Sequence, residues 1–343
     1  MIILGIESTC DETSVGIVKD GTQVLTNIVA SSWAMHKKYG GIVPEVAARE
    51  QVRVVIPTLA EALLESRVES RDIGAIAVAY GPGLIGSLLI GVETAKTLAL
   101  AWDKPLIGVN HLVGHLYANW VEGETVSRVF KNNERAPEFP AIGLVVSGGH
   151  TDLVYMESHK KLKWIGGTLD DAAGEVLDKV GRVLGLGYPG GPEIERQASK
   201  IVGVGEASKI SLPIPMNDKS FNFSFSGIKT AAANQVQWHE AKIDVPKICY
   251  ELQERIFQSL IKKTFVAVEK YNAKSVVVGG GVSANGRLRE MMSVAGEDNN
   301  VKVFFPEKKY STDNGAMIAT AAYYKQKYFD LEKLQADPSL LFA

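Results

Sequence analysis

The sequence predicts an α/β protein built from two domains that repeat one fold. Its 343 residues are enough for two domains of ordinary size. One pattern, a strand, a polar turn and two further strands, occurs over about residues 2–30 and again over about 141–165. Helix and strand patterns follow both copies. We therefore expect a duplicated fold with a central cleft between the copies.

The composition is that of a globular protein without an overall basic charge. Apolar residues make up 46% of the chain, charged residues 22%, and the formal net charge is −2. A nucleic-acid partner would therefore have to bind a local basic patch. The two cysteines, Cys10 and Cys249, fit a reducing compartment and give no disulfide framework. Neither a signal peptide nor a membrane-spanning apolar run is recognised, so we expect a cytoplasmic protein that does not contact membranes.

The first half of the chain begins as a β-meander and continues with alternating helices and strands. Asp20 and Gly21 have the chemistry of a hairpin turn. A helix is expected over about 45–66, where Pro57 should kink or divide it. The other expected elements of this half are strands at 2–6, 15–19, 22–30, 73–79 and 105–109, and a helix from the turn Gly81–Gly86 to about Trp102.

A histidine pair follows the strand at 105–109. His111 and His115 are four residues apart, so on a helix both imidazoles project from one face. Two histidines at this spacing can hold one metal ion, although a chance pairing explains the spacing equally well. The metalloprotease pattern His-Glu-x-x-His has a Glu as general base, whereas this chain has Leu112 there. The pair therefore does not indicate a protease.

Residues 122–139 are polar and charged and end in two prolines, which indicates a domain boundary. We expect an N-terminal domain over 1–121, a linker over 122–139 and a second domain over 140–312. The segment 313–343 should form a C-terminal helix that packs back toward the first domain.

The second half repeats the opening pattern and then becomes mainly helical. Its glycine-rich stretch at 185–192 is expected to be a loop. The other expected elements are strands at 141–146, 152–157, 162–165, 275–278 and 301–305, and helices at 169–184, from Ser226, at 246–271, at 286–295 and at 314–328.

Three polar turns, at 7–14, 147–151 and 279–285, each follow a strand. Backbone N–H groups in such turns can bind phosphate, because glycine lets the backbone approach closely and a following helix adds its dipole. An ordinary tight turn explains any one of them, but three in one chain favour a nucleotide. None has the pattern of a P-loop or of a dinucleotide-binding turn.

Carboxylates line one face of the helix expected at 169–184. Asp171 and Glu175 suit a solvated face, and Thr168 with Asp171 resembles a capping box. Asp178 lies deeper in the helix and could instead accept hydrogen bonds from the hydroxyls of a ribose.

Asp313 precedes the last expected helix. Its ordinary role would be an N-cap. It could instead complete a His-His-Asp metal set with His111 and His115, which leaves coordination positions open for substrate. Such ligands suit Fe(II) or Zn(II).

Several of these segments together resemble the TsaD family, the tRNA N6-adenosine threonylcarbamoyltransferases formerly described as O-sialoglycoprotein endopeptidases. The resemblance runs from residue 2 to about 328. It implies an actin/sugar-kinase/Hsp70-like (ASKHA) fold of two duplicated domains around a cleft. The segments that carry it are Gly5–Ser14, His111 with His115, Val146–Thr151, Asn222–Gly227, Gly279–Asn285 and Thr312–Met317.

The resemblance also implies a reaction and the residues that perform it. The threonylcarbamoyl group passes from threonylcarbamoyl-adenylate to N6 of adenosine 37 in tRNAs that read codons beginning with A, and AMP is released. His111, His115 and Asp313 match the ligands of one divalent metal, Fe(II) in preference to Zn(II), and Asp11 matches an acidic residue beside the reacting centre. The matched substrate positions are Val145, Val146, Ser147, Gly148 and Gly149 for the phosphate and acyl portion, and Asp178, Gly191, Glu195 and Asn285 for the nucleoside.

Val145 stands where archaeal and eukaryotic relatives have a tyrosine that can reach the metal. The protein ligand set is then limited to three, as in the bacterial branch of the family.

The resemblance further implies three partners besides the adenylate: tRNA, a non-catalytic TsaB-like paralogue and a small TsaE-like ATPase. Lys37, Lys38, Arg49 and Arg53 are candidate tRNA contacts, although a solvated surface explains each of them as well. The helix at 45–66 is a candidate contact for the paralogue, with core packing as the alternative reading of its apolar stripe.

Two rival functions are weighed against this transferase. An ASKHA-fold small-molecule kinase would use ATP and Mg²⁺ and would not need the histidine pair. A non-enzymatic scaffold, like the degenerate paralogues of the family, would have lost the metal-binding residues, and this chain retains all three.

Overall fold

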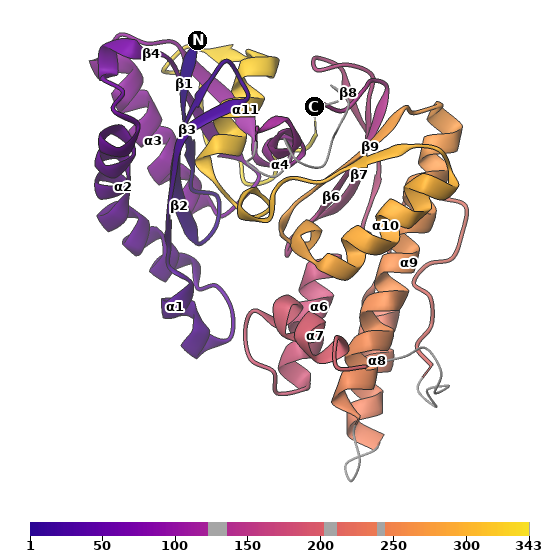
Figure 1. Ribbon diagram of the computed structural model, residues 1–343. Helices are drawn as coiled ribbons and strands as arrows, with labels where there is room; N and C mark the ends of the chain where they lie inside the picture. Colours follow the sequence, from indigo (N-terminus) through magenta and orange to yellow (C-terminus); the bar gives the residue numbers. More distant parts are fainter. Residues whose placement is uncertain (123–135, 202–210, 239–243, 343) are drawn as a thin grey trace. The chain divides into compact units, whose positions relative to one another are not determined.

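The computed structural model describes residues 1–122, 136–201, 211–238 and 244–342 (Figure 1). Most of the expected linker at 122–139 lies outside these residues. The chain divides into two compact units. The first comprises Met1–Pro137, Ser158–Leu162 and Pro306–Ala343, and the second comprises Glu138–Glu157 and Lys163–Phe305.

The first unit contains a six-stranded sheet with the order β11-β5-β4-β1-β2-β3. β1, β2 and β3 form the expected antiparallel meander, whereas β4 and β5 run parallel to β1. The strands are β1 (Ile2–Glu7), β2 (Glu12–Lys19), β3 (Gln23–Ser31), β4 (Ile73–Gly81), β5 (Leu106–Asn110) and β11 (Tyr328–Phe329).

Helices cover both faces of this sheet (Figure 1). α2 and α3 pack on the face where Leu4 and Ile6 of β1 point, and α11 packs on the other face. A Cβ atom on Gly5 would lie 2.3 Å from the carbonyl oxygen of Gly315, so the absence of side chains lets α11 approach β1 closely. The helices are α1 (Trp33–His36), α2 (Pro44–Ser66), α3 (Ile85–Ala101), α4 (His111–Tyr117) and α11 (Gly315–Lys325).

The second unit contains a five-stranded sheet with the order β10-β9-β6-β7-β8. Numbered within each unit, both sheets place their strands in the order 5-4-1-2-3, and the first adds β11 at its edge. This confirms the duplication that the repeated sequence pattern predicts. The strands are β6 (Ala141–Val146), β7 (Thr151–Met156), β8 (Leu162–Gly167), β9 (Ser275–Gly279) and β10 (Lys302–Phe304).

The helices of the second unit pack around one apolar core with alternate residues of β6, namely Ile142, Leu144 and Val146. The long helix α9 contributes the largest number of core residues of any helix in this cluster. The helices are α6 (Ala173–Val183), α7 (Gly190–Ala198), α8 (Ser226–Trp238), α9 (Val245–Tyr271) and α10 (Gly286–Asp298).

Some expected elements differ from the structure. Pro57 lies inside α2, which is not divided there, because Val55 and Leu59 on either side are buried in the core. The stretch expected as a loop at 185–192 ends in the first turn of α7. In the described part of the chain, no helix is both long and apolar enough to span a membrane.

The start of α6 was also expected too early. Thr168 does not form a capping box, since its hydroxyl donates to the carbonyl oxygen of Asp171. The Asp170 carboxylate accepts hydrogen bonds from Ser224, Phe225 and Ser226, and this ties the segment to the loop before α8. The helix therefore begins only at Ala173.

Candidate metal centre and active site

The strand directions of the first sheet place the histidine pair. Because β1, β4 and β5 are parallel, their carboxyl ends meet at one edge of the sheet. β5 leads directly into α4, whose N-terminus is capped by the Asn110 side chain through the backbone N–H groups of Leu112 and Val113. His111 and His115 then lie one turn apart on one face of α4.

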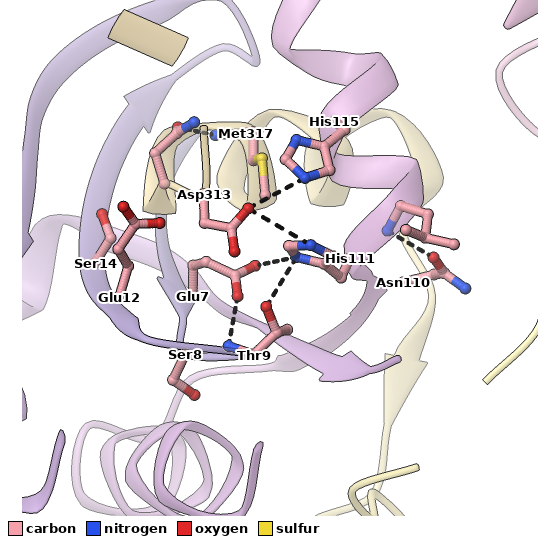
Figure 2. A network of polar contacts seen from close by, with 12 residues as sticks. Glu7, Ser8, Thr9, Glu12, Ser14, Asn110, His111, His115, Asp313 and Met317 are labelled. Carbon is pink, nitrogen blue, oxygen red and sulfur yellow. Dashed lines mark hydrogen bonds and ion pairs between the residues drawn. The ribbon is translucent and has the colours of Figure 1, made fainter. Parts of the chain in front are cut away.

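Three side chains converge at this edge (Figure 2). The Oδ1 atom of Asp313 lies 3.6 Å from Nε2 of His111 and 3.2 Å from Nε2 of His115. One donor atom from each residue lies within 4.8 Å of the others. Ligands of a tetrahedral metal at ordinary bond lengths are separated by about 3.4 Å. The cluster can therefore hold a metal ion, and its mixed imidazole and carboxylate donors fit Fe(II) or Zn(II).

His115 gives a second indication that the cluster fits a metal. The side chain is only 1% exposed, and in the described part of the chain neither of its ring nitrogens makes a hydrogen bond, although Nε2 lies 3.2 Å from Oδ1 of Asp313. A buried nitrogen without a partner is costly, and coordination of a cation would remove that cost for Nε2.

Asp313 is not the N-cap of α11, because the next residue, Asn314, takes that position. The side chain of Asn314 accepts a hydrogen bond from the backbone N–H of Met317 and caps α11. Gly315 and Ala316 are fixed in turn by Ser14 and by Asn27 of the sheet. These contacts hold the turn that carries Asp313 against the sheet that positions His111.

Further acidic side chains surround the cluster. Burial, followed by the carboxylates of Asp313 and Asp11, raises the pKa of Glu12 to about 9. Burial and then Asp313 also raise the pKa of Asp11. Glu7 is fully buried at the end of β1. This group of buried or partly buried acidic side chains, Glu7, Asp11, Glu12 and Asp313, creates a negative potential that favours a cation.

The same carboxylates act on His111. Burial lowers the pKa of His111, but the carboxylates of Glu7 and Asp313 outweigh it and raise that pKa to about 9. In the metal-free protein His111 is therefore an imidazolium at neutral pH, and a metal must displace its proton.

Metal affinity is accordingly expected to rise with pH. Below about pH 9 the apparent affinity should fall about tenfold for each pH unit, because one proton leaves His111 for each ion bound. Calorimetric titration of the metal-free protein with Zn²⁺ between pH 6 and 8, in buffers of different ionisation enthalpy, measures both the affinity and the protons released. An affinity that does not change over this range would contradict the expectation.

The second unit gathers the residues matched to the phosphate and acyl portion of the substrate. Val145 and Val146 are fully buried in β6, backbone included, so neither presents surface to a ligand in this structure. Ser147 begins the turn to β7, and its hydroxyl accepts a hydrogen bond from the backbone N–H of His150. A Cβ atom on Gly148 or Gly149 would meet nothing within 4 Å, so the backbone of this turn is open to approach.

The positions matched to a nucleoside lie at or contact the N-termini of two helices, α7 and α10. Oδ1 of Asp178 accepts from the backbone N–H groups of Gly190, at 2.7 Å, and Gly191, at 3.1 Å, where α7 begins. Oε1 of Glu195 accepts from the backbone N–H of Gly286, and Asn285 caps α10. These contacts bring all four matched positions into one region of the second unit.

Glu7 is not among the individual functional residues predicted from the sequence. Oε2 of Glu7 lies 2.9 Å from Nδ1 of His111, and Oε1 accepts a hydrogen bond from the backbone N–H of Thr9 (Figure 2). The alternation of side chains along β1 could have indicated it, because Ile3, Gly5 and Glu7 point to the same face of the sheet, the one that α11 covers. A carboxylate at such a buried position requires a partner.

Comparison with known proteins agrees with this arrangement. The family described as "TsaD: tRNA N6-adenosine threonylcarbamoyltransferase" matches residues 23–320. A protein of that name from Moorella thermoacetica is 44% identical, covering 98% of this chain and 96% of its own length. The protein of the same name from Thermosipho africanus is also 44% identical, with 99% of both chains covered.

Solved structures show the same fold at low identity. HypF from T. kodakarensis matches with a TM-score of 0.61 and 15% identity, covering 97% of this chain and 49% of that one. Component A of (R)-2-hydroxyglutaryl-CoA dehydratase from Acidaminococcus fermentans matches with a TM-score of 0.52 and 14% identity, covering 95% and 98%. The two sheets thus have the expected ASKHA fold. The chain belongs to the TsaD family of tRNA N6-adenosine threonylcarbamoyltransferases.

Proposed function

We propose that this protein transfers the threonylcarbamoyl group from threonylcarbamoyl-adenylate to N6 of adenosine 37 in tRNAs that read codons beginning with A. The observation that carries the proposal is the buried cluster of His111, His115 and Asp313 in a chain of this family. The N6 amine attacks the carbamoyl carbon and forms the new N–C bond. The C–O bond to the phosphate breaks, AMP leaves with the electron pair, and one amine proton passes to a base.

The residues of the first unit are assigned to the reacting centre. A divalent ion on His111, His115 and Asp313, Fe(II) in preference to Zn(II), would supply Lewis-acid polarisation of the carbamoyl carbonyl. Asp11 accepts the proton from the amine. Burial and then Asp313 raise the pKa of Asp11, which brings this carboxylate closer to the pKa of an effective base near neutral pH.

The backbone of Asp11 is held in place by a single residue. Its carbonyl oxygen accepts hydrogen bonds from both the backbone N–H and the hydroxyl of Ser32, at 3.1 and 2.7 Å. Fixing the backbone limits the positions that the carboxylate can take, as proton transfer at a defined atom requires.

The second unit is assigned to the adenylate. The open backbone at Gly148 and Gly149 suits the phosphate, since it can be approached without a side chain in the way. Ser147 is assigned to the phosphate beside them, although its backbone N–H already donates to the carbonyl oxygen of His150. The region of Asp178, Gly191, Glu195 and Asn285 is assigned to the nucleoside. Asp178 and Glu195 each use one carboxylate oxygen in the backbone hydrogen bonds described above.

Reconstitution tests the function directly. Purified protein, the TsaB-like paralogue, the TsaE-like ATPase, unmodified tRNA and threonylcarbamoyl-adenylate are incubated, and the tRNA nucleosides are analysed by mass spectrometry. We expect threonylcarbamoyladenosine at position 37 and one AMP for each transfer. No modified nucleoside with all partners present, together with Mg²⁺-dependent ATP turnover on a sugar or acetate, would favour the kinase instead.

Contacts with tRNA remain assigned to the basic residues near α2. The side chains of Arg49 and Arg53 are 79% and 78% exposed, and each lies near a glutamate of the same helix. Lys38 lies over the ring of Tyr39, and the side chain of Lys37 lies outside the described part of the chain. Exposed helical ion pairs are weak, so a phosphate can compete for these guanidinium groups.

We place the TsaB-like paralogue on the outer face of α2. Val55 and Leu59 of this helix are buried, but Val52 and Ile56 are 62% and 60% exposed, one turn apart on another face. Adjacent exposed apolar side chains on a surface helix suit a protein partner.

Replacing both Val52 and Ile56 with Glu is expected to abolish co-purification of the paralogue. The change should move the unfolding free energy by less than about 1 kcal/mol, because both side chains are exposed. Glu61→Gln, at an exposed position of the same helix, is the matched control and should retain the paralogue. Undiminished binding by the double variant would place the partner elsewhere.

A further inference from the structure

We infer that Glu7 is a positioning residue that fixes the tautomer and orientation of His111 so that Nε2 faces the metal. The inference rests on the metal role in the proposed function. Oε2 of Glu7 lies 2.9 Å from Nδ1 of His111, and both side chains are buried, Glu7 completely. Nε2 of the same ring points to Asp313 (Figure 2).

The carboxylate of Glu7 is itself held at both oxygens. While Oε2 faces His111, Oε1 accepts a 2.7 Å hydrogen bond from the backbone N–H of Thr9. Glu7 is the last residue of β1, which pairs with β2 on one side and β4 on the other. The carboxylate that meets His111 therefore extends from a central strand of the sheet and is held at both of its oxygens.

An ionised carboxylate only accepts hydrogen bonds, so it requires the proton of a metal-bound His111 to be on Nδ1. The lone pair of Nε2 is then available to a metal. Thr9 cannot impose this choice, although its Oγ1 lies 3.2 Å from the same Nδ1, because a hydroxyl can donate as well as accept.

The second histidine lacks such a partner. In the described part of the chain, Nδ1 of the buried His115 has no hydrogen-bond partner. The two candidate ligands thus differ in how their imidazole rings are fixed. Glu7 sets the tautomer and orientation of His111, and no comparable hydrogen bond does so for His115. Loss of Glu7 should therefore affect the metal site through His111.

Glutamine is the sharpest substitution for Glu7, because it preserves the shape of the side chain. Glu7 accepts from two donors, the N–H of Thr9 and the Nδ1–H of His111. Glutamine has one acceptor oxygen and one NH₂ group, so one of these donors would face another donor. Alanine removes both acceptors.

The experiment measures metal binding by the full chain without substrate. Metal-stripped wild type, Glu7→Gln and Glu7→Ala are titrated with Co²⁺ and with Zn²⁺, and the visible spectrum of the Co²⁺ form is recorded. We expect affinities about 10-fold lower for Glu7→Gln and about 100-fold lower for Glu7→Ala, with an altered Co²⁺ spectrum. Circular dichroism reports whether each variant is folded.

Glu254→Gln is the matched control. Glu254 is also a buried carboxylate, paired with Arg287 at 2.6 and 3.0 Å in the second unit. Its variant is expected to lose stability but to keep the wild-type metal affinity and spectrum.

The outcomes separate this inference from the proposed function. Glu7→Gln with the affinity and spectrum of wild type would overturn the positioning role and leave the transferase intact. A wild-type protein that binds neither ion would overturn the metal site as well. If Glu7→Ala does not fold, Glu7→Gln alone decides the result.

Discussion

Replacement of His111 with Ala is expected to abolish threonylcarbamoyl transfer and metal retention together. The cluster has three side chains that can act as ligands, and the change removes one of them. Lewis-acid polarisation contributes several kcal/mol, so its loss should lower the rate by a factor on the order of 10³ or more. Nucleoside mass analysis and metal content after purification measure the two effects.

The same change leaves Glu7 without its imidazole partner. Because Glu7 is a fully buried carboxylate, the cost exceeds the value of about 1–3 kcal/mol for a neutral unpaired group, and circular dichroism measures whether the first unit remains folded. His159→Ala is the matched control. This half-buried histidine stacks on Tyr324 at 4.2 Å between ring centroids and lies in the same unit.

The control variant should keep both metal and transfer. If His111→Ala, metal-free and folded, still modifies tRNA at the wild-type rate, then the metal has no part in the reaction.

The two halves of the duplicated fold have diverged at corresponding turns. At the first of these turns, Glu7 ends β1, Asp11 lies in the turn and Glu12 begins β2, and these acidic side chains favour a cation. The turn after β6 carries Gly148 and Gly149, whose open backbone suits an anion. The corresponding turns of the two units thus differ in the sign of the charge that they favour.

The sequence predicts those parts of the site that depend on local spacing. The two histidines follow a strand at helical spacing, and the repeated strand pattern predicts the three-stranded meander with which each half begins. Asp313 could be predicted only as an alternative to an N-cap, because the competing cap, Asn314, is its immediate neighbour. Which of the two residues caps α11 depends on the backbone conformation of Asp313 and Asn314, and the spacing of residues in the sequence does not determine that conformation.

Other features depend on contacts between distant segments. Glu7 meets His111 across 104 positions of the chain. The glycine-rich stretch before α7 resembles a loop, yet Asp178 binds the N–H groups of Gly190 and Gly191 and stabilises a helix start there. The local sequence pattern of each segment does not show which distant residue it contacts.

Gly16→Ala is expected to cause a large loss of stability in the first unit. A Cβ atom there would lie 2.2 Å from the backbone nitrogen of Ala316, at the start of α11. Backbone atoms cannot turn aside as a side chain can, so helix and sheet must separate. The cost should be about 3 kcal/mol, which exceeds the gain of about 0.4–1 kcal/mol from a less flexible unfolded chain.

The same displacement should weaken the metal site. Asp313 lies two residues before α11. His111 and His115 both lie on α4, which follows β5 of the sheet from which α11 would move. Thermal unfolding followed by circular dichroism should show a midpoint lower by roughly 6–12 °C, and Zn²⁺ titration should show a lower affinity in the folded protein. Gly227→Ala, where a Cβ atom meets nothing within 4 Å, should change neither quantity in this direction. If Gly16→Ala unfolds at the wild-type midpoint and binds Zn²⁺ normally, then close packing of α11 on β2 does not position Asp313.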